Sequence, residues 1–182
     1  MKEIAIICLL PKEVNKFYLE LRQKIAKQFD FNVNHKVPAH ITIKYGFPFE
    51  DLGEVERVVQ EFCLSQSKTK WELHDFGNFV NPDNRVVFID AIPSRETRKV
   101  HKKFYDDLQK IKWIQWAQYD SVNLHYHITL VSKGITSENY EAVWSFVNQQ
   151  EKPNFEVYFD NLALFRIEND PPFIYQEYHF PD

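Results

Sequence analysis

The chain repeats its own order of apolar segments at a nearly constant distance. Judged from alternating and helical spacing of apolar residues, each half runs strand, helix, strand, helix, strand, and the second half adds one strand. Two copies of such a long unit are too few for a solenoid, so we predict two α+β lobes that face each other across a central groove. The matching positions are 82 to 87 residues apart and comprise Ile4 and Val86, His40 and His127, Val55 and Tyr140, and Trp71 and Phe155.

The expected helices and strands can be placed along the chain. Helical spacing predicts helices at about 14–25, 55–62, 100–111 and 140–147, the last with Ser137 as its N-cap. Alternating or short apolar runs predict strands at 4–10, 40–46, 71–79, 86–92, 126–131, 155–165 and 173–180, with turn signals at 81–84 and 169–172. No linker divides the chain. We therefore expect residues 1–182 to form one domain of two pseudo-symmetric halves, about 1–81 and 82–182, with two antiparallel sheets and outer helices around the groove.

The two halves match most closely at a His-x-Thr motif, which reads HITI at 40–43 and HITL at 127–130. Chance would give only about 0.2 such motifs in a chain of this composition. Because side chains alternate along a strand, His40 and Thr42 project from one face and the two isoleucines from the other. His127 and Thr129 have the same relation. Two such strands facing each other would surround one phosphate with two imidazoles and two hydroxyls.

That set of side chains suits the cleavage of a phosphoester. A base must deprotonate the nucleophile, and an acid must protonate the leaving oxygen. Histidine titrates near neutral pH, so one imidazole can be neutral while the other is charged. The threonine hydroxyls can hydrogen-bond the non-bridging oxygens as negative charge develops there.

The motifs also carry a family resemblance. The segments VPAHITIKYGF at 37–47 and HYHITLVSKG at 125–134 resemble the 2H phosphoesterase superfamily, and more narrowly its 2′-5′ RNA ligase and 2′,3′-cyclic phosphodiesterase branch. This resemblance implies a bilobal fold, no metal or other cofactor, and substrates with 2′,3′-cyclic phosphate or 2′-5′ phosphodiester linkages in nucleotides or at RNA ends. It implies His40, Thr42, His127 and Thr129 as the functional set. By the same analogy His127 would activate water and His40 would protonate the leaving oxygen.

Two further residues near the motifs are candidates for substrate binding. Lys44 has the same parity as His40 and Thr42 and could steer the phosphate, although a solvated lysine is the alternative. His125 lies two residues before His127, where it could tune a catalytic imidazole or line the rim of the groove. The remaining histidines have no matched partners, and we expect no role for them: His35, His74, His101 and His179.

Three aromatic residues flank the motifs and could stack on a nucleobase. Phe47, just past a glycine, is the best candidate for stacking. Tyr45 and Tyr126 have the opposite parity from the histidines, so we expect them in the core.

Two other functions remain open. His40, His125 and His127 could hold zinc with water as the fourth ligand, which would make the protein a zinc-dependent hydrolase. Against this, the chain contains no His-Glu-x-x-His motif and no carboxylate within the motif strands. The groove could also serve a non-catalytic module that binds a nucleotide or an RNA end.

Composition narrows the setting. The net charge of −4 and the pI near 6.0 do not suit a surface that coats nucleic acid, so any RNA is expected at one local site. Cys8 and Cys63 lie in apolar patterns, and buried free thiols fit a reducing compartment. The apolar run at 4–10 is too short to cross a membrane. We therefore expect a cytoplasmic protein with no membrane contact and no obligate protein partner.

Overall fold

The computed structural model describes residues 2–32, 37–81, 84–121, 123–167 and 172–181. Within them the elements are β1 (Glu3–Leu9), α1 (Lys12–Phe29), β2 (His40–Pro48), α2 (Gly53–Leu64), β3 (Thr69–Asn81), β4 (Asn84–Pro93), α3 (Arg95–Leu108), β5 (His127–Val131), α4 (Tyr140–Asn148), β6 (Asn154–Phe159), β7 (Asn161–Arg166) and β8 (Phe173–His179). The four predicted helices and the order of elements are confirmed.

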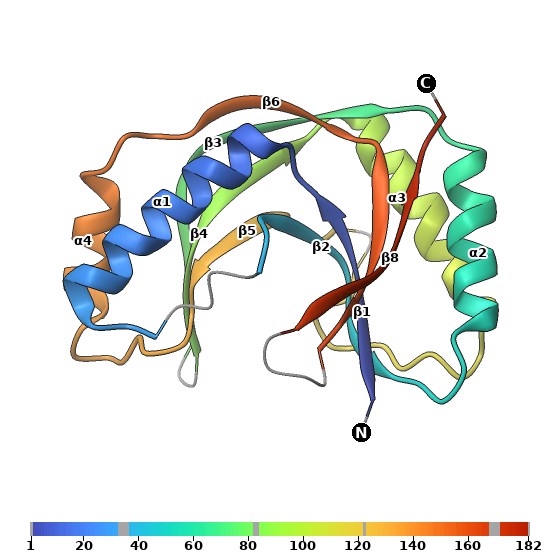
Figure 1. Ribbon diagram of the computed structural model, residues 1–182, viewed down its shortest axis with the longest axis horizontal. Coiled ribbons are helices and arrows are strands. Elements are labelled where there is room, and N and C mark those ends of the chain that lie inside the picture. Colours follow the sequence, from blue (N-terminus) through green and yellow to red (C-terminus); the bar gives the residue numbers. More distant parts are fainter. Residues whose placement is uncertain (1, 33–36, 82–83, 122, 168–171, 182) are drawn as a thin grey trace.

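The strands form two four-stranded antiparallel sheets, which confirms the predicted α+β fold class. The first sheet has the order β2-β1-β7-β8 and the second the order β5-β4-β3-β6. In both sheets the strand that begins with the His-x-Thr motif is an edge strand, and the opening strand of the same half lies beside it. The helices contact each other in the pairs α1 with α4 and α2 with α3, on opposite sides of the molecule (Figure 1).

The second half of the chain contributes to both sheets. The run at 155–165, predicted as one strand, is divided at Asp160 into β6 of the second sheet and β7 of the first. The buried side chain of Asn161 explains where β7 starts. Its amide accepts a hydrogen bond from the backbone N–H of Leu9 (2.8 Å) and donates one to the Leu9 carbonyl (3.0 Å), which fixes this residue to the end of β1.

The repeat of about 84 residues therefore holds for some elements and not for others. Trp71 and Phe155 match by their distance along the sequence, yet they lie on β3 and β6, which are neighbours within one sheet. The division into pseudo-symmetric halves stays a prediction.

Smaller details differ at element ends. Helix α4 begins at Tyr140 with Asn139 at its N-cap, so Ser137 does not cap it. Ile111 lies beyond the end of α3, although it is buried as predicted. The expected turns include residues 82–83 and 169–171, which lie outside the described residues.

The core confirms the predicted inward faces of the motif strands. Ile41, Ile43, Ile128 and Leu130 are all almost completely buried in the main hydrophobic cluster between the sheets and helices. Cys8 and Cys63 are buried and free, also as predicted. In the described part of the chain, no helix has the length and apolar character needed to cross a membrane.

Candidate active site

The two motif strands meet in the middle of the molecule. Strands β2 and β5 contact each other across the gap between the sheets, and they lie side by side in Figure 1. Both keep the predicted alternation, because His40, Thr42, His127 and Thr129 are half-buried while the residues between them are buried. The edges of the two sheets are thus brought together with the motif side chains on their accessible faces.

Both motif imidazoles are held by the same hydrogen bond. The Nδ1 of His40 lies 2.8 Å from the carbonyl oxygen of Pro38, and the Nδ1 of His127 lies 2.9 Å from that of His125. A carbonyl oxygen can only accept, so Nδ1 carries the proton in both rings. This fixes the tautomer and leaves Nε2 as the nitrogen that can take up or release a proton.

Burial is the main cause of a lowered pKa in both imidazoles. For His40 the positive charges of Arg22 and His127 lower the pKa further, and for His127 the charge of His125 does the same. Because the charge of His127 lowers the pKa of His40, the two imidazoles lie close enough to interact electrostatically. Both rings are therefore mostly neutral at neutral pH when the groove is empty.

Phenylalanine side chains pack against the imidazoles. The ring of His127 lies 4.9 Å from that of Phe88 and 5.1 Å from that of Phe79, and the ring of His40 lies 5.4 Å from that of Phe165. Phe88 packs against Gly77, where a Cβ would overlap the phenyl ring. The glycine thus allows the aromatic support of His127 to lie close to the sheet.

A cleft of about 390 Å³ opens beside β5. His125, His127 and Thr129 line it, whereas His40 and Thr42 are not among its lining residues. The other residues that line it are Tyr45, Phe79, Asn81, Asn84, Val86, Tyr119, Ser121, Asn123, Leu124 and Ser132. The cleft thus adjoins one motif, and the second motif lies on the neighbouring edge strand.

Comparison with known proteins assigns the family. The family model of the 2′-5′ RNA ligase superfamily matches residues 11–171. The chain belongs to this superfamily. A Bacillus licheniformis protein named "putative phosphoesterase" is 20% identical over 161 residues, which make up 87% of this chain and 89% of that protein.

Solved structures share the fold of this superfamily member. TT0787 of Thermus thermophilus has a TM-score of 0.67 at 15% identity and covers 99% of this chain and 98% of its own. E. coli LigT complexed with ATP has a TM-score of 0.64 at 15% identity over 100% of this chain and 99% of LigT. LigT complexed with 3′-AMP aligns with a TM-score of 0.63.

In this protein a further histidine, His125, lies at the cleft. His125 is exposed, lines the cleft as predicted, and lies 2.9 Å from a carboxylate oxygen of Asp90. Asp90 is also the cross-strand partner of His127. The negative charge of Asp90 raises the pKa of His127, while the positive charge of His125 lowers it. The contact between His125 and Asp90 is therefore placed to tune the motif imidazole beside it.

Two predicted substrate contacts are wrong. Lys44 is 1% exposed and Phe47 is completely buried, so neither reaches the groove. The prediction for Lys44 relied on strict alternation beyond Thr42, whereas Phe47 has the parity of Ile41 and Ile43 and is buried as they are. The register between β1 and β2 shifts on both sides of Ile6, and these irregularities turn Lys44 into the interior.

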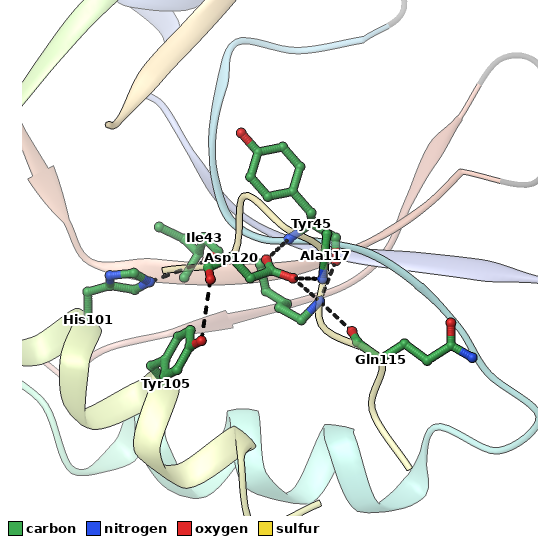
Figure 2. A network of polar contacts seen from close by, with 8 residues as sticks. Ile43, Tyr45, His101, Tyr105, Gln115, Ala117 and Asp120 are labelled. Carbon is green, nitrogen blue, oxygen red and sulfur yellow. Dashed lines mark hydrogen bonds and ion pairs between the residues drawn. The ribbon is translucent and has the colours of Figure 1, made fainter. Parts of the chain in front are cut away.

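A buried ion pair compensates the charge of Lys44 in the interior. Its ammonium group donates to Asp120 (2.8 Å) and to the carbonyl oxygens of Tyr45 (3.0 Å) and Gln115 (2.9 Å). The Asp120 carboxylate also accepts from the backbone N–H groups of Tyr45 (3.0 Å) and Ala117 (2.6 Å). Figure 2 shows how these contacts tie the segment that follows α3 to β2.

Sequence reasoning misplaced one tyrosine and missed another. Tyr126 lies in the core as predicted, but Tyr45 lines the cleft together with Tyr119. No motif surrounds Tyr119 or Asp120. Their importance depends on contacts with β2, which is more than 70 residues away in the chain.

His101, for which no role was expected, connects the two motif strands through buried hydrogen bonds. Its Nε2 donates to the carbonyl oxygen of Ile43 (3.3 Å), and its Nδ1 accepts from the hydroxyl of Tyr126 (2.6 Å). Burial lowers the pKa of His101 to about 4. The neutral ring therefore links β2 to the residue that precedes His127.

The described residues contain no group of three or more histidine, cysteine, aspartate or glutamate side chains arranged to hold a metal ion. The alternative zinc set of His40, His125 and His127 is thus not gathered around one point in the described part of the chain.

Proposed function

We propose that this protein is a metal-independent phosphoesterase that cleaves 2′,3′-cyclic phosphate or 2′-5′ phosphodiester linkages in nucleotides or at RNA ends. The observation that carries the proposal is the matched Nδ1 hydrogen bond of His40 and His127, since it leaves Nε2 of each ring available for proton transfer. Membership of the 2′-5′ RNA ligase superfamily supports it. The complexes of LigT with ATP and with 3′-AMP favour a nucleotide as the ligand. Two buried free thiols favour a reducing compartment such as the cytoplasm.

The two imidazoles would divide the proton transfers between them. Nε2 of His127 takes a proton from water as the water oxygen forms a bond to phosphorus. His40 gives a proton to the ribose oxygen as its bond to phosphorus breaks. Thr42 and Thr129 donate hydrogen bonds to the non-bridging oxygens as their charge grows. In the ligation direction the two histidines exchange these roles.

The lowered pKa of His127 suits its role as the base, because the imidazole is neutral before substrate binds. His40 must instead be protonated to act as the acid. A bound phosphate brings negative charge close to the imidazole, and an opposite charge within about 4–6 Å favours the protonated form. Substrate binding therefore helps to charge the acid.

The test is a screen of 2′,3′-cyclic nucleotides and 2′-5′ dinucleotides, with the phosphate position in the product assigned by phosphorus NMR. His40→Ala and His127→Ala should each lower kcat/KM by about 10²–10⁴, and the losses should not add in the double variant. His74→Ala is the matched control, because His74 is half-exposed on β3, bonds Glu72 and is not among the residues that line the cleft. A His40→Ala enzyme with full activity would contradict the proposal.

The threonines provide a graded second test. Thr42→Val and Thr129→Val should cost about 10–100-fold in kcat/KM, because each removes a hydrogen bond to a charged oxygen worth about 1.5–3 kcal/mol.

The same preparation separates the alternatives. Activity should survive chelators. Loss of turnover on chelation, restored by zinc, would identify a zinc-dependent hydrolase, and nucleotide binding without turnover would identify a binding module.

A further inference from the structure

The two His-x-Thr motifs lie on strands of different sheets. Among the described strands, β2 is an edge strand of the first sheet and β5 an edge strand of the second, so no ladder of backbone hydrogen bonds joins them. Two imidazoles that act on one phosphate need a fixed separation, and a displacement of about 1 Å can cost about 10²-fold in rate. The spacing of the two motifs therefore depends on contacts between the sheets.

Two buried polar side chains connect these strands right beside the motifs. Nε2 of His101 donates to the carbonyl oxygen of Ile43 (3.3 Å), as Figure 2 shows, and the Tyr126 hydroxyl donates to Nδ1 of His101 (2.6 Å). Ile43 is the residue after the threonine of one motif, and Tyr126 is the residue before the histidine of the other. The carbonyl oxygen of Tyr126 accepts from the backbone N–H of Ala91, which fixes the tyrosine to β4 of the second sheet (3.1 Å).

Helix α3, which carries His101, is bound to both sheets. Thr97 lies one helical turn before His101, and both side chains belong to the buried face of the helix. The hydroxyl of Thr97 donates to the carbonyl oxygen of Lys70 on β3 (2.8 Å), in the second sheet. His101 then reaches Ile43 on β2, in the first sheet. The helix thus connects the two sheets through two hydrogen-bonding side chains one turn apart.

Packing alone does not require polar side chains at these positions. His101 is 1% exposed and Tyr126 is 2% exposed, and the ring of Trp71 packs edge-on against the tyrosine (4.7 Å). Burial of a polar group costs free energy that its hydrogen bonds offset, and apolar side chains of the same shape can be equally stable. The polar pair differs from an apolar pair in its geometry, because satisfied buried hydrogen bonds fix one arrangement of the groups that they join.

We propose that His101 and Tyr126 are positioning residues, which set the separation of the His40 and His127 imidazoles through their bonds to the two motif strands. This inference rests on the proposed function and deepens it, because it assigns a part in catalysis to two core residues that are not among those lining the cleft. Loss of the pair should lower kcat more than it changes KM, since phosphate can still bind while the proton transfers are misaligned.

The test removes the hydrogen bonds and keeps the volume of the side chains. In the double variant His101→Leu/Tyr126→Phe neither side chain leaves the other unpaired, so the Tm should stay within about 4 °C of wild type. For a nucleoside 2′,3′-cyclic phosphate, kcat should nevertheless fall about 10- to 100-fold, while KM should change less than about threefold. His101→Gln should retain most of the activity, because its amide offers one donor and one acceptor side by side.

Val147→Ala is the control for stability. Val147 is completely buried on α4 and is not among the residues that line the cleft. This variant should lower the Tm and leave kcat unchanged. If the double variant fails to fold, Tyr126→Phe, which removes a single hydroxyl, is measured in the same way and should show the same loss in kcat.

The outcomes separate the positioning role from the proposed chemistry. A wild-type kcat in the double variant, or a loss carried by KM, with activity lost in His127→Ala, would overturn the role and leave the phosphoesterase intact. If wild-type protein turns over no substrate, the proposed function fails, and NMR titration of the imidazoles decides the role. Because burial lowers the pKa of His40 and His127, separated strands should expose both rings and raise both pKa values in the double variant. Unchanged pKa values would then overturn the inference.

Discussion

The buried ion pair between Lys44 and Asp120 allows a quantitative prediction. Their side chains are only 2% and 1% exposed, and their charged atoms lie 2.8 Å apart. Burial lowers the pKa of Lys44, and the hydrogen bond and charge of Asp120 oppose that shift. Asp120→Asn would leave a buried ammonium group without its counter-ion. It would also leave one of two backbone N–H donors, from Tyr45 and Ala117, without a carboxylate oxygen.

Removing one partner from a buried ion pair typically costs about 3–5 kcal/mol. A domain of this kind has a free energy of unfolding of about 5–15 kcal/mol, so the loss should be a large part of the total. Lys44→Met should also destabilise, because it leaves two carbonyl oxygens and a carboxylate without the ammonium group. The double variant contains no unpaired charge, so its loss should be smaller than the sum of the single losses by at least about 1 kcal/mol.

Urea denaturation of the two single variants and the double variant measures these losses. Lys70→Met is the control, because the Lys70–Glu156 pair is as short, at 2.7 Å, but is about half-exposed on both sides. It should change the free energy of unfolding little, since water screens such a pair. Single losses no larger than that of the control, or strictly additive losses, would refute the reasoning. Asp120→Asn should also raise KM for nucleotides, because it loosens the segment that carries Tyr119.

Three further predictions concern pH and packing. The pH profile of kcat/KM should be bell-shaped and centred at a lower pH than unperturbed histidines would give, because burial lowers the pKa of His40 and His127. Bound phosphate should move the profile of kcat to higher pH. Coincident profiles of kcat and kcat/KM would contradict this. Gly77→Ala should cost about 1–3 kcal/mol in thermal unfolding and lower kcat/KM, because the new methyl group displaces Phe88 from beneath His127; an unchanged Tm would count against it. The pKa of His101 falls from 6.5 to about 4 on folding, so the unfolded chain takes up the proton first as the pH falls. The free energy of unfolding should therefore drop by up to about 3 kcal/mol between these two pH values. In His101→Gln, the denaturation midpoint should depend less on pH over the same range.

The sequence by itself determined the four helices and the accessible faces of the two motif strands. Alternation along a strand is a local property, so HITI and HITL were enough to place His40 and His127 with their threonines on the accessible face. Helical spacing likewise placed all four helices, because it depends only on residues within a few turns. The repeated order of apolar segments therefore predicted the α+β fold, and the matched motifs predicted which histidines and threonines are accessible.

The tertiary structure alone decided the residues whose surroundings come from distant segments. Lys44 turns inward because β1 shifts its register against β2, which no local pattern records. The chain changes sheets at Asp160 within a continuous apolar run, because each side of the run finds a different partner strand. Asp120 becomes a buried counter-ion, and Tyr119 a wall of the cleft, only after folding brings them beside a strand 76 residues away in sequence. Long-range pairing, and not residue type or spacing, assigns these positions.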